Sequence, residues 1–108
     1  MTGTVQEGFV KVATTGEIPP GITRKVETSG QEILIINLDG QYYAINNICT
    51  HVGGPLDEGR LEHDEVVCPW HGSRFDVKTG EVRGGPARLP EQKYEVKVEG
   101  DDILIKIR

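Results

Sequence analysis

The most constraining feature of this 108-residue sequence is a pair of short segments that contain both of its cysteines and two of its three histidines. One segment reads C-T-H at residues 49–51, and the other, sixteen residues later, reads C-P-W-H at residues 68–71. Thiolate sulfur and neutral imidazole nitrogen are ligands that iron and zinc prefer, and four such groups in two short loops can form one closed site. We therefore expect a metal centre bound by four side chains: Cys49, His51, Cys68 and His71.

Two alternatives use the same residues. A disulfide between Cys49 and Cys68 would leave both histidines unexplained, and nothing in the sequence indicates an oxidising compartment. A structural zinc ion is the stronger alternative, because two cysteines and two histidines are a common zinc ligand set. Zinc fingers, however, generally place their cysteines in one knuckle and their histidines on a helix, whereas each segment here mixes the two. The mixed segments argue against a zinc finger, and the pattern ranks a disulfide below zinc.

Size and composition limit the classes of protein that fit. The chain has the length of one domain, and its longest apolar run, Ile33 to Ile36, has four residues, whereas about eighteen are needed to cross a bilayer. Residues 1–7 have neither the basic start nor the apolar core of a signal peptide, so we expect a cytoplasmic protein that does not associate with membranes. The net charge is −5 and the twelve basic residues are scattered, which argues against nucleic-acid binding.

Glycine and proline punctuate the sequence and no window keeps a helical period, which predicts short strands joined by turns. We expect strands at residues 9–13, 23–28, 32–38 and 41–46, with tight turns at Ser29-Gly30 and Asp39-Gly40 and a loop over 16–21. Between the ligand segments, short strands at 61–62 and 65–67 would place His63 in a turn. Further strands are expected at 74–77 and 81–82, and alternating apolar residues predict a terminal hairpin over 94–98 and 103–107. The predicted fold class is all-β and antiparallel.

The ligand segments and the residues after them resemble the Rieske family, whose signature is C-x-H, a spacer of about this length, then C-x-x-H. The run V-G-G-P-L at 52–56 resembles the family's glycine-rich turn, and G-S-R-F-D at 72–76 resembles part of its H-G-S/A-x-F/Y-D run. The resemblance implies that Cys49 and Cys68 bind one iron of a 2Fe-2S cluster and that His51 and His71 bind the other. It also implies a small β-sandwich base, residues 1–43 and 88–108, with a cluster-binding subdomain, residues 44–87, inserted into it.

The same resemblance implies an electron carrier rather than an enzyme. High-potential Rieske proteins have two further cysteines where this chain has Gly54 and Trp70, and a tyrosine where it has Phe75, so we expect a lower potential here. In this respect the chain is similar to the soluble ferredoxin components of aromatic-ring dioxygenase systems, which carry electrons from a flavin reductase to a terminal oxygenase. The small Rieske-like subunit of an enzyme such as assimilatory nitrite reductase also fits the length, although many of those subunits lack the ligands.

Residues near the ligands receive expected roles from the resemblance. Ser73 would donate a hydrogen bond to a cluster sulfur, whereas Phe75 cannot donate one. A loop over residues 83–87 would pass close to the cluster. An apolar collar around the histidines would exclude water and form a docking face, and its expected members are Val52, Pro55, Leu56, Trp70 and Pro86.

Overall fold

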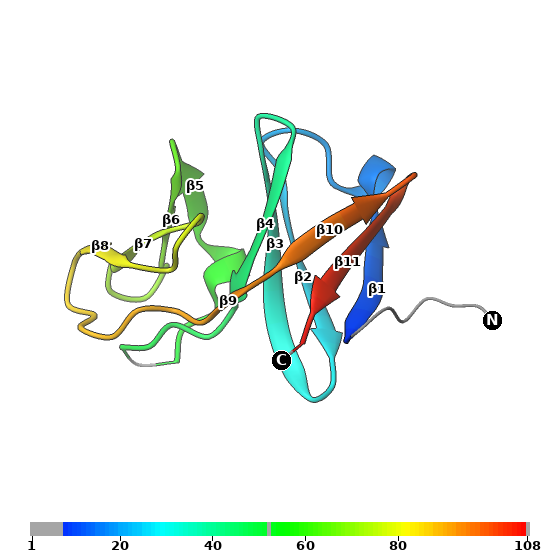
Figure 1. The fold of residues 1–108 in the computed structure, drawn as a ribbon. Helices are drawn as coiled ribbons and strands as arrows, with labels where there is room; N and C mark the ends of the chain where they lie inside the picture. The colour runs from blue at the N-terminus through cyan, green and yellow to red at the C-terminus, as the bar shows by residue number, and fades with distance from the viewer. Residues whose placement is uncertain (1–7, 52, 108) are drawn as a thin grey trace.

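The structure is a computed structural model that describes residues 8–51 and 53–107; residues 1–7, Val52 and Arg108 lie outside the described part, including the amino-terminal segment considered for a signal peptide. Eleven strands and two three-residue 3-10 helices form the described part, and the strands make three antiparallel sheets (Figure 1). No helix within the described ranges is long and apolar enough to cross a membrane. The all-β antiparallel prediction is confirmed.

The first sheet has the order β1-β11-β10 and contains both ends of the described chain. Its strands are β1 (Phe9–Thr14), β10 (Val96–Glu99) and β11 (Asp102–Lys106). The terminal hairpin was predicted as one strand over 94–98 paired with 103–107. In the structure the first of these is broken at Glu95, because β9 (Lys93–Tyr94) pairs with a strand of the second sheet instead.

The second sheet has the order β2-β3-β4-β9, with β2 at Thr23–Thr28, β3 at Gln31–Leu38 and β4 at Gln41–Asn46. The turns Ser29-Gly30 and Asp39-Gly40 have positive φ at both residues, which matches the twist of a tight hairpin. The predicted 16–21 loop contains most of η1 (Thr15–Glu17), a short helix whose Glu17 carboxylate accepts the N–H of Thr14 at 2.9 Å.

Strand β3 separates two hydrophobic cores. Leu34 and Ile36 face the core that contains both cysteines, and Ile33 and Ile35 face the core under the first sheet. All four side chains are 0% exposed. A strand covered on both faces is continuously apolar, which explains the longest apolar run of the sequence.

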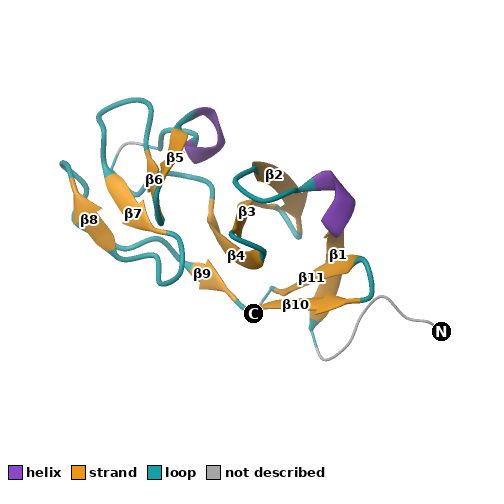
Figure 2. Cartoon of the chain, turned by 90° about the horizontal axis from the view of Figure 1, so that it is seen from above, coloured by secondary structure: helices purple, strands orange, loops and turns teal. Residues whose placement is uncertain are grey.

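The third sheet lies between β4 and β9 along the chain and stands beside the other two (Figures 1 and 2). Its order is β5-β6-β7-β8, with strands at Arg60–Glu62, Glu65–Val67, Arg74–Asp76 and Val82–Gly84, and η2 (Leu56–Glu58) precedes it. The last strand was expected at 81–82 and runs further, because Arg74 pairs with Gly84 across a bulge. The two ligand segments enter this sheet before β5 and between β6 and β7.

Candidate metal centre

The two ligand segments fold into loops with the same backbone hydrogen bonds. In each loop the cysteine N–H donates to the carbonyl five residues on, at 2.8 Å in both, and the cysteine carbonyl accepts the N–H four residues on, at 2.9 and 3.1 Å. The residue four positions on is Gly53 or Gly72, with φ of 82° and 79°, a region that glycine adopts without steric cost. We call residues 49–54 the first ligand loop and residues 68–73 the second.

The loops place the two ligand types at different depths. Cys49 and Cys68 are each 2% exposed and pack in one core with Phe75, whereas His51 and His71 are both exposed. The two imidazole rings lie edge to face, with centroids 5.3 Å apart and planes at 84°. In the described part of the chain Cys49 and Cys68 are not joined by a disulfide, which argues against the disulfide alternative.

The arrangement supplies the two pairs of donors that a two-iron cluster needs. Among the described residues, no group of three or more histidine, cysteine, aspartate or glutamate side chains converges on one point where a metal ion could bind. A structural zinc ion requires four donors about 2.0–2.3 Å from one centre. A Rieske cluster requires only two donors at each iron, one sulfur pair and one imidazole pair. A buried sulfur pair beside an exposed imidazole pair matches that requirement.

A third loop, residues 84–91, lies against both ligand loops. Ala87 donates its N–H to the hydroxyl of buried Ser73 at 3.1 Å, and Thr50 donates its hydroxyl to the carbonyl of Leu89 at 2.6 Å. At Gly85, with φ of 82°, an added Cβ would lie 2.6 Å from the Ser73 Cα, so glycine permits the close approach. The hydroxyl of Ser73 accepts in this bond and keeps its hydrogen for donation elsewhere, which is compatible with the expected role at a cluster sulfur.

Glu91 is a feature of the site that the sequence analysis did not identify. Its side chain is 4% exposed, and its carboxylate accepts, at 3.0 Å, the N–H of Thr50, which lies between Cys49 and His51 in the sequence. Burial raises the pKa of Glu91 from its usual 4.5 to about 7, and the Thr50 hydrogen bond acts in the opposite direction. Both chain neighbours of Glu91 are exposed, so no apolar pattern in the sequence marks this position as buried.

The expected apolar collar is partly wrong. Trp70 is 56% exposed, Pro86 is exposed and Pro55 is half-buried, while Val52 lies outside the described residues. Leu56, in contrast, is 1% exposed and packs in the same core as both cysteines, so it cannot face a partner. The sequence analysis missed two exposed apolar side chains beside the first ligand loop: Leu89, at 65% exposure, and Ile48, at 39% exposure and directly before Cys49.

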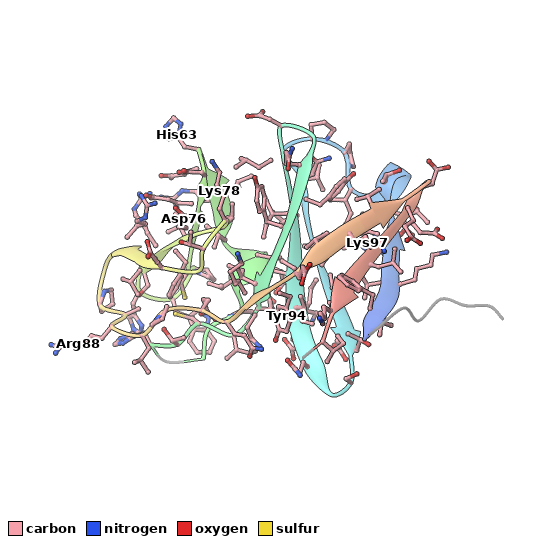
Figure 3. The ribbon with its side chains drawn as sticks, viewed as in Figure 1. His63, Asp76, Lys78, Arg88, Tyr94 and Lys97 are labelled. Carbon is pink, nitrogen blue, oxygen red and sulfur yellow. The ribbon has the colours of Figure 1, made fainter. Side chains whose placement is uncertain are left out.

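The third histidine does not join the site. His63 is exposed in the turn between β5 and β6, with a φ of 57°. Figure 3 shows His63 at the tip of that hairpin, away from Arg88, which projects from the third loop. The predicted position of His63 in a turn is confirmed.

The fold and the site together define a class: a small antiparallel β-protein in which two Cys-His loops can hold a two-iron cluster, with its imidazole side exposed. The family model described as the Rieske [2Fe-2S] domain matches residues 8–105, and the chain belongs to this family. Its cofactor is therefore a Rieske-type 2Fe-2S cluster, and its role is electron transfer, as the resemblance implied.

Similar proteins point to the ferredoxins of this family. The ferredoxin component of biphenyl 2,3-dioxygenase from Rhodococcus jostii (strain RHA1) is 36% identical over 99 residues, which cover 92% of each chain. The ferredoxin of carbazole 1,9a-dioxygenase from Nocardioides aromaticivorans IC177 superposes with a TM-score of 0.90 at 35% identity, covering 94% of this chain and 100% of that one. A structure described as a complex of reduced oxygenase and oxidised ferredoxin in carbazole 1,9a-dioxygenase matches at a TM-score of 0.88 and 30% identity, covering 94% of both chains.

Proposed function

We propose that this chain is the ferredoxin component of an aromatic-ring dioxygenase system. It receives one electron from a flavin reductase and passes it to a terminal oxygenase. The observation that supports this most is the exposed pair His51 and His71 beside the buried pair Cys49 and Cys68, because an electron carrier needs an accessible edge next to a protected centre. The relatives named as ferredoxin components, and the complex of an oxygenase with its ferredoxin, support the choice of partners.

We further propose that Cys49 and Cys68 bind the inner iron and that His51 and His71 bind the outer one. When bound, the cluster gains and loses a single electron. The core around the cysteines excludes water from the sulfur side, and the two histidines are exposed on the other side. Residues 44–87, which hold all four ligands, then act as a cluster-binding subdomain inserted into the β-sandwich base.

The partner surface would surround the histidines. Residues 48–55, 68–73 and 84–90 contain no aspartate or glutamate, although the whole chain has a net charge of −5. Trp70 and Leu89 are exposed there, and Arg88 projects from the third loop (Figure 3). A small apolar face with one cation suits a transient electron-transfer encounter, and we place this encounter in the cytoplasm.

The ligand set is tested by counting iron and acid-labile sulfide in the purified protein and recording EPR spectra before and after dithionite. We expect two irons per chain and a reduced signal with the low average g-value of mixed histidine and cysteine ligation. His71→Ala should lose the cluster, and His63→Ala is the matched control because His63 lies in the β5–β6 turn. A colourless zinc protein, or equal loss of iron in both variants, would contradict the proposal.

The partners are tested with the flavin reductase and the terminal oxygenase of a biphenyl dioxygenase system. We expect NADH and the reductase to bleach the oxidised protein, and the oxygenase to reoxidise the reduced protein in a rapid-mixing experiment. An iron-loaded chain that exchanges electrons with neither enzyme would contradict the assignment to such a system while leaving the cluster assignment intact.

A further inference from the structure

The two ligand loops differ at the residue that follows the cysteine. Their backbone hydrogen bonds are otherwise equivalent, with matching donors, acceptors and glycine positions. In the second loop this residue is Pro69, which has no N–H to satisfy. In the first loop it is Thr50, whose N–H is not used within the loop and requires an acceptor from elsewhere.

That acceptor is an unusual group for its position. Glu91 is 4% exposed, and no ion pair reaches it among the described residues. A buried carboxylate without a cation is costly, so its persistence requires a compensating interaction. The hydrogen bond from the Thr50 N–H, at 3.0 Å, is the interaction that the carboxylate makes.

The backbone of Glu91 is fixed from the other side. Its N–H donates to the carbonyl of Gly80 at 2.7 Å, and a Cβ added at Gly80 would lie 2.2 Å from the carbonyl oxygen of Glu91. The turn that contains Gly80 begins at β7, the strand that follows the second ligand loop. The backbone of Glu91 is therefore bound to the turn after β7, while its side chain binds the first ligand loop.

We propose that Glu91 is a positioning residue for the first ligand loop: its carboxylate supplies the acceptor at Thr50 that proline makes unnecessary in the second loop. The N–H of Thr50 lies in the peptide plane that Thr50 shares with Cys49, so fixing it orients the backbone that leads from Cys49 to His51. Glu91 thereby fixes the position of the exposed histidine relative to the buried cysteine. This inference rests on the ligand set given under the proposed function.

The test is a double-mutant cycle built on the difference between the loops. Glu91→Leu removes the acceptor, and Thr50→Pro removes the donor by copying the second loop. Thr50→Val is the matched control, because it loses the hydroxyl, as Thr50→Pro does, but keeps the N–H. Glu91→Gln keeps an oxygen that can accept the same bond. Each variant is made as the full chain with its cluster.

Three properties are measured in these variants: amide exchange of the peptide containing Thr50 by mass spectrometry, the width of the reduced EPR signal, and the rate of cluster bleaching under fixed conditions. In Glu91→Leu we expect exchange at Thr50 to rise roughly 10-fold to 100-fold, the cost of losing a charge-assisted hydrogen bond. The EPR signal should broaden, because His51 is no longer held in one position. Glu91→Gln keeps a neutral acceptor, so both properties should lie between those of Glu91→Leu and the wild type and closer to the wild type.

The proposal predicts that the effect of Glu91→Leu depends on which residue stands at position 50. In the Thr50→Pro background Glu91→Leu should change EPR width and bleaching rate by less than about threefold, whereas in the Thr50→Val background it should act as in the wild type. If Glu91→Leu alone does not load a cluster, recovery of loading in the double variant with Thr50→Pro supports the proposal. Equal effects in both backgrounds, or a Thr50→Pro chain that does not load, would overturn it. Wild-type protein without iron would instead refute the ligand set.

Discussion

Gly54→Ala is the substitution that tests most directly how closely the two ligand loops approach each other. A Cβ added at Gly54 would lie 2.8 Å from the Sγ of Cys68 and 3.2 Å from the Cγ of Trp70. Ordinary contacts between heavy atoms are about 3.5–4.0 Å, so the sulfur would have to move by about 0.7 Å or more. Trp70 is exposed and can move aside, whereas the Cys68 sulfur is buried and belongs to the proposed ligand set.

Overpacking of this kind costs typically about 1–3 kcal/mol, which for a domain of this size corresponds to a fall in Tm of roughly 4–20 °C. The atom displaced is the sulfur of Cys68, a proposed iron ligand. We therefore expect the cluster of Gly54→Ala to bleach faster on heating than that of the wild type. The assay is visible absorption and circular dichroism during thermal unfolding at one fixed scan rate.

Gly16→Ala is the matched control. Gly16 lies in η1, does not have a positive φ, and has no atom within 4 Å of an added Cβ. It should therefore unfold within a degree or two of the wild type. A Gly54→Ala protein with the Tm and cluster lifetime of the control would refute the close approach of the two loops.

Three further predictions concern other parts of the site. Phe75→Tyr adds a hydrogen-bond donor to a side chain that is 0% exposed and lies in the core with both cysteines. It should raise the reduction potential by roughly tens of millivolts. A redox titration that shows no rise would contradict a hydrogen bond from this position to the cluster. Trp70→Glu should slow electron transfer to the oxygenase in rapid-mixing experiments and leave the reduction potential nearly unchanged. Its control is Val98→Glu, which changes an exposed apolar residue of β10. Equal transfer rates in the two variants would show that Trp70 is not part of the docking face. Burial raises the pKa of Glu91 from 4.5 to about 7. Between these two pH values the folded protein therefore binds more protons than the unfolded chain, and its free energy of unfolding falls as pH rises. Glu91→Gln should flatten that part of the pH profile in urea titrations, and an unchanged slope would assign it to another group.

Much of the fold was predictable because the signals are local. The turns at Ser29-Gly30 and Asp39-Gly40 require positive φ at consecutive residues, a requirement visible in the residue types themselves. Strand alternation and the four-residue apolar run likewise report which faces are covered. The break at Glu95 was not predictable, because Tyr94 and Val96 continue one alternating pattern although they pair with different sheets.

In the candidate site, too, some features were predictable from the sequence and others were not. Spacing alone paired each cysteine with a histidine, because ligands two or three residues apart lie in one short loop whatever the rest of the chain does. Spacing could not show that Leu56 is buried while Leu89 is exposed, since both are leucines close to proline in loop-rich sequence.

The candidate ligand residues, most of the strands and the tight turns could be read from the sequence, because all of these depend on interactions within a few residues. The side chains that surround the ligand loops could be identified only in the folded chain. The clearest case is Glu91, which meets Thr50 across 41 residues of sequence. Burial and hydrogen-bond partners at that separation are set by how the third loop packs against the first, and no local pattern records that packing.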